Sequence, residues 1–140
     1  MIKQIDFASL LEIEEIEKEC FVDCYSKQTL INTFNSPSFL GFMEIDGEVK
    51  GYILASAVVD TADIDKVAVK KAYRNQKIAT SLILHLENEL KSNGVKEVFL
   101  EVRRSNLSAI NLYKSNGYQK ISERHNYYGD EDALIFKKYL

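Results

Sequence analysis

Two side chains of the sequence are well suited to proton transfer, and the first is a glutamate near the end of a predicted strand. Residues 97–102 read Glu-Val-Phe-Leu-Glu-Val, so Glu101 and Phe99 point to one face and the valines and leucine to the other. Both faces carry apolar residues, which predicts an interior strand with Glu101 near its carboxyl end, where open α/β sheets bind ligands. Loss of solvation there would raise the pKa of the carboxyl toward the range of a general base. A solvent-facing strand glutamate is the alternative interpretation.

The second side chain is Tyr113, on a helix predicted at residues 108–116 and closed by Gly117. A phenol has a reference pKa of about 10, so it stays protonated at neutral pH and can donate its proton to a leaving group. Taken alone, an aromatic packed on the sheet is the simpler interpretation. Asn106, just past the strand, is either an amide that faces a ligand or a turn residue.

Histidines and cysteines add no further chemistry. His85 is interleaved with leucines on a predicted helix and is expected to be structural, and His125 is expected at an exposed strand end. Cys20 and Cys24 have no second pair and no nearby histidine to complete a zinc site. We therefore expect packed or free thiols in a reducing compartment, and no metal.

A strand, a basic loop and a helix follow one another from residue 63 to residue 90. Ile64, Val67 and Val69 are the β-branched members of the strand, and the loop 70–77 carries four basic residues. The helix is marked by apolar residues at helical spacing and by a stop at Gly94. Its free N–H groups and dipole would stabilise a phosphate at its start, although an ordinary strand–loop–helix connection also explains the pattern.

Composition limits the classes of protein to which the chain can belong. The 140 residues are 46% apolar and 28% charged, as in one soluble globular domain, 1–140. A net charge of −3 with scattered basic residues gives no argument for nucleic acid. No apolar run reaches the roughly 18 residues of a membrane span, and the amino-terminal residues lack the core of a signal peptide. Cytoplasmic localisation without membrane contact is the expectation.

The remaining elements complete a mixed α/β pattern. We expect a short strand at 2–6, a helix over 10–21 with its acidic residues facing water, and a helix that starts after the N-cap Ser26. Strands at 39–45 and 49–59 are joined by Asp46-Gly47, and strands at 118–127 and 133–138 form a final pair. The order predicts a three-strand meander followed by a βαβαβ segment.

Several motifs taken together resemble the GNAT acetyltransferases, over nearly the whole chain. The most particular part of the match is Arg124-His125-Asn126-Tyr127-Tyr128, followed by Glu131-Asp132-Ala133. The others are Val67-Ala68-Val69, Arg74-Asn75-Gln76-Lys77-Ile78-Ala79, Leu100-Glu101-Val102-Arg103, Ser105-Asn106, Ala109-Ile110-Asn111-Leu112-Tyr113 and Asn116-Gly117-Tyr118. The resemblance implies a central mixed, mostly antiparallel β-sheet flanked by helices on both faces, and acetyl-CoA as donor.

The resemblance also implies roles for single residues. The backbone of Val67, Ala68 and Val69 would pair with the pantetheine arm, and Asn106 would hold the cofactor near its sulfur. The pyrophosphate would lie in the loop formed by Arg74, Asn75, Gln76, Lys77, Ile78, Ala79 and Thr80. Glu101 would be the general base on the acceptor amine, and Tyr113 the general acid on the departing thiolate. Direct transfer needs no protein nucleophile.

Within the family, the sequence is similar to bacterial enzymes that acetylate the N-terminal alanine of a ribosomal protein. Tyr25, Tyr127 and Tyr128 are candidates to line the groove for that acceptor, because amphipathic aromatics pack along a peptide while their hydroxyls bond its backbone. A monomer or weak dimer is expected. Other acceptors, such as other N-termini, lysines or a small polyamine, remain open.

Two departures from the family pattern concern the two substrates separately. Lys77 stands where the family has a glycine that lets the backbone approach the phosphates. It either adds charge at the pyrophosphate or weakens the loop, and a CoA-binding sensor without turnover is therefore a further alternative. Cys24-Tyr25 replaces the Pro-Trp pair of many relatives at the border of the acceptor groove.

Overall fold

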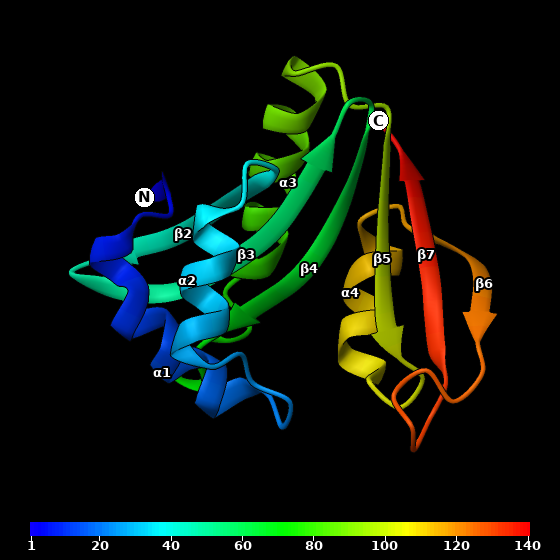
Figure 1. The fold of residues 1–140 in the computed structure, drawn as a ribbon, viewed down its shortest axis with the longest axis horizontal. Helices are drawn as coiled ribbons and strands as arrows, with labels where there is room; N and C mark the ends of the chain where they lie inside the picture. The colour runs from blue at the N-terminus through cyan, green and yellow to red at the C-terminus, as the bar shows by residue number, and fades with distance from the viewer.

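The computed structural model describes every residue from Met1 to Leu140, and its centre is one seven-stranded sheet. The strand order across the sheet is β1-β2-β3-β4-β5-β7-β6 (Figure 1). The strands are β1 (Ile2–Gln4), β2 (Phe39–Asp46), β3 (Glu48–Val58), β4 (Thr61–Val69), β5 (Glu97–Arg103), β6 (Gln119–Arg124) and β7 (Ala133–Tyr139). The α-helices are α1 (Leu10–Cys20), α2 (Lys27–Asn35), α3 (Ile78–Ser92) and α4 (Leu107–Ser115), with 3-10 turns at Phe7–Ser9 and Lys71–Tyr73.

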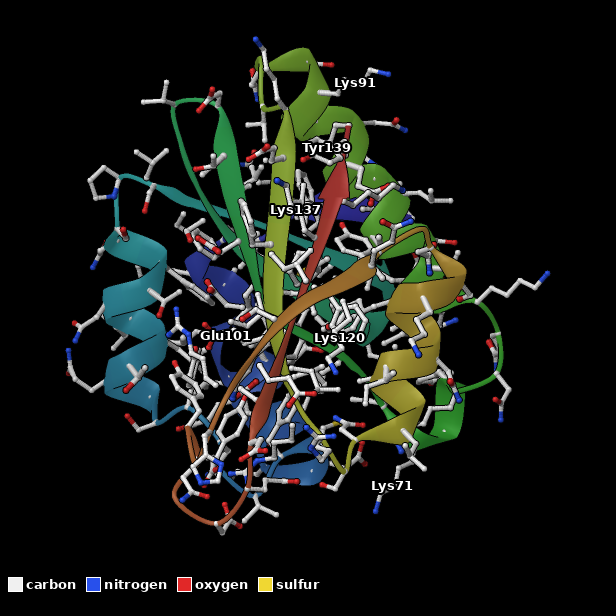
Figure 2. All side chains as sticks on the ribbon, turned by 90° about the vertical axis from the view of Figure 1, so that its right-hand side faces the viewer. Lys71, Lys91, Glu101, Lys120, Lys137 and Tyr139 are labelled. Atoms are coloured by element: carbon white, nitrogen blue, oxygen red, sulfur yellow. The ribbon has the colours of Figure 1, made fainter.

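Helices cover both faces of the sheet, as Figure 2 shows with α2 on one side and α3 and α4 on the other. The core under α3 and α4 contains 18 buried residues, among them Leu82, Leu86 and Val98. The core under α1 and α2 contains 10, among them Ile13 and Leu30. Leu82, Ile83, Leu86 and Leu90 of the long helix are buried and Ile78 packs partly buried against the same core, which confirms the predicted face of the helix.

All neighbouring strands are antiparallel except β4 and β5, and this pair separates part-way along its length. The parallel ladder joins only Thr61–Ile64 to Glu97–Leu100. Beyond it, the register between β3 and β4 shifts between Leu54 and Ala55, which leaves Asp65 as an extra residue in β4. A bulge increases local twist and turns a strand away from its neighbour. The ends of β4 and β5 therefore diverge, and the sheet opens between them.

Helices α2 and α4 begin at a residue whose side chain caps the first turn, whereas α3 has no such cap. Ser26 caps α2 as predicted, since its hydroxyl accepts a hydrogen bond from the Thr29 N–H at 3.1 Å. Asn106 caps α4 in the same way, accepting from the Ala109 N–H at 3.2 Å, so its turn role is real. Helix α3 instead begins after Lys77, which lies in the left-handed region with φ 63° and provides no side-chain cap.

Two features differ from the expectations or extend them, and a third agrees with them. The acidic residues of α1 do not all face water, because Glu17 is fully buried. It accepts hydrogen bonds from the Tyr52 hydroxyl, the Tyr25 N–H and the Lys66 ammonium. Strand β7 lies between β5 and β6 rather than at the edge. No helix is both long and apolar enough to cross a membrane.

Candidate active site

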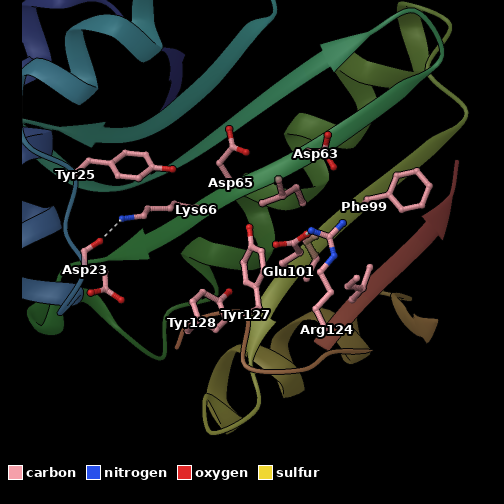
Figure 3. Close-up of a pocket in the computed structure, with 13 residues that line it drawn as sticks. Asp23, Tyr25, Asp63, Asp65, Lys66, Phe99, Glu101, Arg124, Tyr127 and Tyr128 are labelled. Atoms are coloured by element: carbon pink, nitrogen blue, oxygen red, sulfur yellow. Dashed lines mark hydrogen bonds and ion pairs between the residues drawn. The ribbon is translucent and has the colours of Figure 1, made fainter. Parts of the chain in front are cut away.

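A cavity of about 640 Å³ lies at the opening between β4 and β5, on the face covered by α1 and α2 (Figure 3). We call it the acidic cavity. Its polar walls are Asp23 and Tyr25 from the α1–α2 loop, Asp63, Asp65 and Lys66 from β4, Glu101 from β5, and Arg124, Tyr127 and Tyr128 from the end of β6 and the loop after it. Glu101 thus lies near the carboxyl end of an interior strand, as predicted, and it lines a cavity rather than open surface.

The acidic cavity carries more unpaired negative than positive charge. Both cations at its wall have partners: Lys66 contacts buried Glu17 at 2.7 Å, and Arg124 contacts Glu101 at 3.3 Å. Asp63 and Asp65 make no side-chain hydrogen bond or ion pair with the protein, and Figure 3 shows both on the strand above Glu101. The cavity therefore suits a ligand that brings its own positive charge or N–H donors.

Proton affinity is raised at these two carboxyls. Both side chains contact water, yet the cavity walls remove part of their hydration. Partial burial, followed by repulsion from Asp63, raises the pKa of Asp65 to about 6. Partial burial and the nearby Glu101 also raise the pKa of Asp63.

The three tyrosines predicted for the acceptor side all line the acidic cavity. The Tyr127 ring packs edge-on against Tyr128, with ring centroids 5.0 Å apart. The nearby Glu101 carboxylate raises the pKa of the Tyr127 hydroxyl, so the phenol keeps its proton. The Tyr25 ring packs against the Lys66 ammonium, 3.8 Å from the ring centroid.

A second cavity, of about 600 Å³, lies where β4 ends and α3 begins, and we call it the loop cavity. Its walls include the end of β4, the loop before α3, the first turn of α3 and one side of α4. The predicted residues that line it are Val67, Ala68, Val69, Arg74, Asn75, Lys77, Ile78, Ala79, Thr80 and Asn106. Gln76 is the member of the predicted loop that does not line it.

The start of α3 offers free donors to an anion in the loop cavity. The N–H groups of Ile78, Ala79 and Thr80 donate no hydrogen bond within the protein, and the helix dipole adds positive potential at the same place. Asn75 and Lys77 both have φ 63°, so this turn is formed without glycine. The donor set fits a pyrophosphate.

The edge of β4 that faces the opening is available to an extended ligand. The Lys70 N–H donates to the Lys50 carbonyl of β3, and by strand alternation the N–H and C=O groups of Val69 point to the other edge. The Val69 carbonyl already accepts from the Arg74 guanidinium, at 3.1 Å. Arg74 also donates to the free thiol of Cys20 at 3.5 Å.

Tyr113 lies on the wall of the loop cavity and is buried, with 7% of its surface exposed. Its ring packs edge-on against Tyr118, so Tyr113 is a packed aromatic residue as well as part of the cavity wall. Burial raises the pKa of its phenol well above the usual range, which keeps the proton on the hydroxyl. Glu101 and Tyr113 therefore face different cavities, which adjoin along β4, where Lys66 lines the acidic cavity and Val67 lines the loop cavity.

The comparisons with known proteins agree with this geometry. Residues 10–118 match the model of the Acetyltransferase (GNAT) family. The protein belongs to the GNAT acetyltransferase family. The ribosomal protein bS18-alanine N-acetyltransferase of Escherichia coli (strain K12) is 32% identical over 139 residues, which are 96% of this chain and 93% of that relative.

Solved structures show the same fold. The crystal structure of the ribosomal-protein-S18-alanine N-acetyltransferase from Escherichia coli matches with a TM-score of 0.92 at 30% identity, over 99% of this chain and 92% of that one. Arabidopsis thaliana NAA60 in complex with acetyl-CoA matches in fold, with a TM-score of 0.88 at 21% identity, over 100% and 98%. This GNAT acetyltransferase is an N-acetyltransferase that uses acetyl-CoA as donor, and its predicted fold class is confirmed.

Several residues of the acidic cavity were not singled out from the sequence. Asp63, Asp65 and Lys66 place three charges on an interior strand, and this pattern is itself a signal of a cavity. Arg124 belonged to a motif but had no role assigned. The two histidines lie as expected: His85 packs on Phe42, with ring centroids 4.6 Å apart, and His125 is exposed beside Asp132.

Proposed function

We propose that this GNAT acetyltransferase acetylates the N-terminal α-amine of a protein, and that the acceptor is a ribosomal protein that begins with alanine. The observation that carries the proposal is the arrangement of Glu101 in the acidic cavity and Tyr113 in the loop cavity, on either side of one opening in the sheet. The Escherichia coli relative named for this activity supports it, because the match covers almost the full length of both chains.

The acidic cavity suits the acceptor. An α-amine has a reference pKa of about 8 and arrives mostly as an ammonium at neutral pH. Asp63 and Asp65 would attract that cation, and Glu101 would take its proton, directly or through one water. The lone pair of the amine is then free to attack.

The loop cavity suits the donor. Acetyl-CoA supplies the thioester carbon to which the new C–N bond forms. The free N–H groups at the start of α3 would hold the pyrophosphate, and the open edge of β4 would align the pantetheine arm. When the C–S bond breaks, Tyr113 would give its proton to the departing sulfur, and the raised pKa of the phenol keeps that proton in place until then. The attacking nitrogen would lose its second proton, through water, to the Tyr113 phenolate, which restores the phenol and leaves a neutral amide.

This function implies a location and an assembly. A ribosomal protein as acceptor would place the enzyme in the cytoplasm. Both cavities are built from one chain, so a monomer or weak dimer suffices.

The test compares three acceptors with acetyl-CoA as donor, read by mass spectrometry. A peptide with a free N-terminal alanine should be acetylated at its α-amine. The same peptide with a blocked N-terminus and an internal lysine should not react, and neither should spermidine. Efficient acetylation of the blocked lysine peptide, or of spermidine alone, would move the enzyme to another acceptor class.

Tyr128→Ala tests the acceptor side within that assay. The substitution should weaken use of the peptide and leave acetyl-CoA binding by calorimetry unchanged, because Tyr128 lines only the acidic cavity. Equal losses for both substrates would argue against a separate acceptor site.

A further inference from the structure

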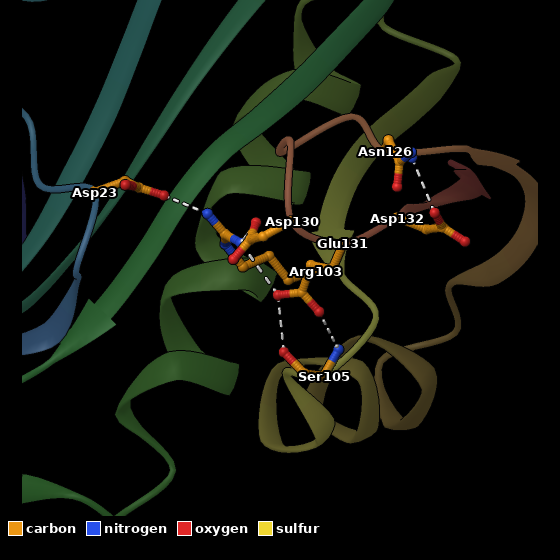
Figure 4. Close-up of polar contacts among 7 residues, drawn as sticks. All are labelled: Asp23, Arg103, Ser105, Asn126, Asp130, Glu131 and Asp132. Carbon is orange, nitrogen blue, oxygen red and sulfur yellow. Dashed lines mark hydrogen bonds and ion pairs between the residues drawn. The ribbon is translucent and has the colours of Figure 1, made fainter.

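Arg103, the last residue of β5, contacts two loops that come from opposite ends of the chain (Figure 4). Its Nη2 is paired with the carboxylate of Asp23, in the α1–α2 loop. Its Nη1 donates to Asp130 Oδ1 at 2.9 Å and to Glu131 Oε1 at 3.1 Å, both in the β6–β7 loop. Its guanidinium carbon also lies 4.2 Å from the centroid of the Tyr128 ring.

The two loops form two of the walls of the acidic cavity. The α1–α2 loop carries Tyr25, and the β6–β7 loop carries Tyr127 and Tyr128. No hydrogen bond or ion pair joins residues 21–26 directly to residues 125–132, so the Arg103 guanidinium is the polar link between the two walls. Its flat fork suits this task, because it can bind carboxylates on two sides while it stacks on an aromatic ring.

The contacts are unequal in strength, and this decides which wall depends on Arg103. Glu131 is also held by Ser105, whose N–H and hydroxyl donate to it at 3.1 and 2.9 Å. The β6–β7 wall is therefore attached without Arg103. The Asp23 side chain has no such second anchor, and 71% of it is exposed. The other polar contacts of this loop, from the Lys66 ammonium to the Asp23 carbonyl at 3.1 Å and from the Tyr25 N–H to Glu17 at 2.7 Å, tie it to β4 and α1 and not to the β6–β7 loop. Exposed ion pairs contribute little to the free energy of unfolding. The Arg103–Asp23 pair can therefore fix the position of the α1–α2 loop while its loss leaves the fold stable.

We propose that Arg103 is a positioning residue that clamps the α1–α2 loop to the β6–β7 loop and so sets the width of the acceptor cavity. The proposal rests on the proposed function for its meaning, since the acceptor is taken to bind between these loops. Arg103 touches neither the reacting atoms nor the loop cavity. Its loss should act on the acceptor and spare the donor.

The kinetic test uses Arg103→Gln and Asp23→Asn with an N-terminal peptide. Each variant should raise the KM for the peptide by roughly two- to fivefold, the upper part of the range for one exposed ion pair, with kcat and the KM for acetyl-CoA unchanged. The double variant should be no worse than Arg103→Gln, because both changes remove one interaction. Asp23→Glu keeps the carboxylate and should restore most of the peptide KM.

A neighbouring arginine gives the matched control. Arg104 pairs with Glu123 at 2.6 Å and with Asp132, which belongs to the β6–β7 loop. Unlike Arg103, it does not contact the α1–α2 loop. Arg104→Gln should leave all kinetic constants unchanged. An unchanged peptide KM in Arg103→Gln, or an equal rise in the KM for acetyl-CoA, would overturn the clamp.

Hydrogen exchange separates failure of the clamp from failure of the proposed function. Amides of residues 21–26 should exchange faster in Arg103→Gln and Asp23→Asn than in wild type and Arg104→Gln, whichever acceptor the enzyme uses. Unchanged exchange in these amides would refute the clamp. Faster exchange together with no acetylation of any N-terminal peptide would support the clamp and refute the proposed acceptor.

Discussion

The loop cavity and the acidic cavity adjoin along β4, but they are built from different groups. The loop cavity presents backbone: free N–H groups at the start of α3 and the open edge of β4. The acidic cavity presents charged and aromatic side chains from four separate segments of the chain. Every residue except proline has a backbone N–H donor, whatever its side chain is. A cavity wall made of side chains, in contrast, changes with each substitution.

This difference predicts that the donor site tolerates an unusual residue at position 77. Lys77 occupies a left-handed position where glycine is favoured, yet the N–H groups that follow it keep their direction. The proposed acceptor side should have no such tolerance, because Asp63, Asp65 and Tyr25 would act through their side chains. Substitutions in the two cavities should therefore separate donor effects from acceptor effects.

The largest expected effect is that of Glu101→Gln in the acidic cavity. The variant keeps the shape of the side chain but cannot accept the proton of the amine, so kcat should fall by roughly 10²-fold or more. The loss should shrink as the pH rises past about 8, where the free amine accumulates. Rates measured from pH 6.5 to 9 would check this, and a pH-independent loss would argue against the base role.

Tyr113→Phe is the corresponding change in the loop cavity. It removes the proton that the leaving sulfur would receive, so kcat should fall by about tenfold or more. Affinity for acetyl-CoA should change little, because the ring still fills its place against Tyr118. Calorimetry and steady-state rates would check both statements. A near wild-type rate would mean that another donor, such as water, protonates the thiolate.

A smaller effect is expected from Asp65→Asn, and it is measured as a change in stability. The pKa of Asp65 is about 6 in the native state against an ordinary 3.8, so the native state binds this proton more tightly than the unfolded state does. The charged carboxyl thus destabilises the fold above pH 6, and that cost disappears as the pH falls toward 3.8. Asp65→Asn should raise Tm at pH 8, with a gain that vanishes near pH 4. A gain that grows on acidification would contradict the raised pKa.

The smallest effect is expected from Lys77→Gly, on the backbone of the loop cavity. Glycine relieves the left-handed conformation, so the free energy of unfolding should rise by about 1 kcal/mol or less. Acetyl-CoA should bind at least as well, provided that the lysine adds no charge contact to the pyrophosphate. Denaturant unfolding and calorimetry would check the two parts, and weaker binding in the variant would show that Lys77 holds the phosphates.

Features of the fold that depend on residues close together in the sequence could be predicted from the sequence pattern. The apolar spacing of α3, the Ser26 cap and the two-faced pattern around Glu101 were each predicted, because one helix face, one cap or one strand determines them. The spacing of three between Ile64 and Val67 was the visible trace of the bulge at Asp65. The strand was predicted there without a bulge.

Features that join distant segments could not be predicted in this way. Glu17 is buried because Tyr52 and Lys66 come from 35 and 49 residues away, and no helical pattern contains them. Arg103 meets Asp23 across 80 residues. Resemblance to the family supplied the roles of Glu101 and Tyr113, while the charges around them are visible only in three dimensions.

The place of β7 inside the sheet has a consequence for how the enzyme comes into being during translation. Glu101 pairs in the ladder with Ile135, so the strand that carries the proposed base is unpaired on one side until β7 has been made. Chains fold as they emerge, amino-terminal parts first, and long-range pairing is slow. β1 to β4 can form a sheet while the ribosome still holds β7. The acidic cavity is therefore completed only after the sheet of β1 to β4 can form.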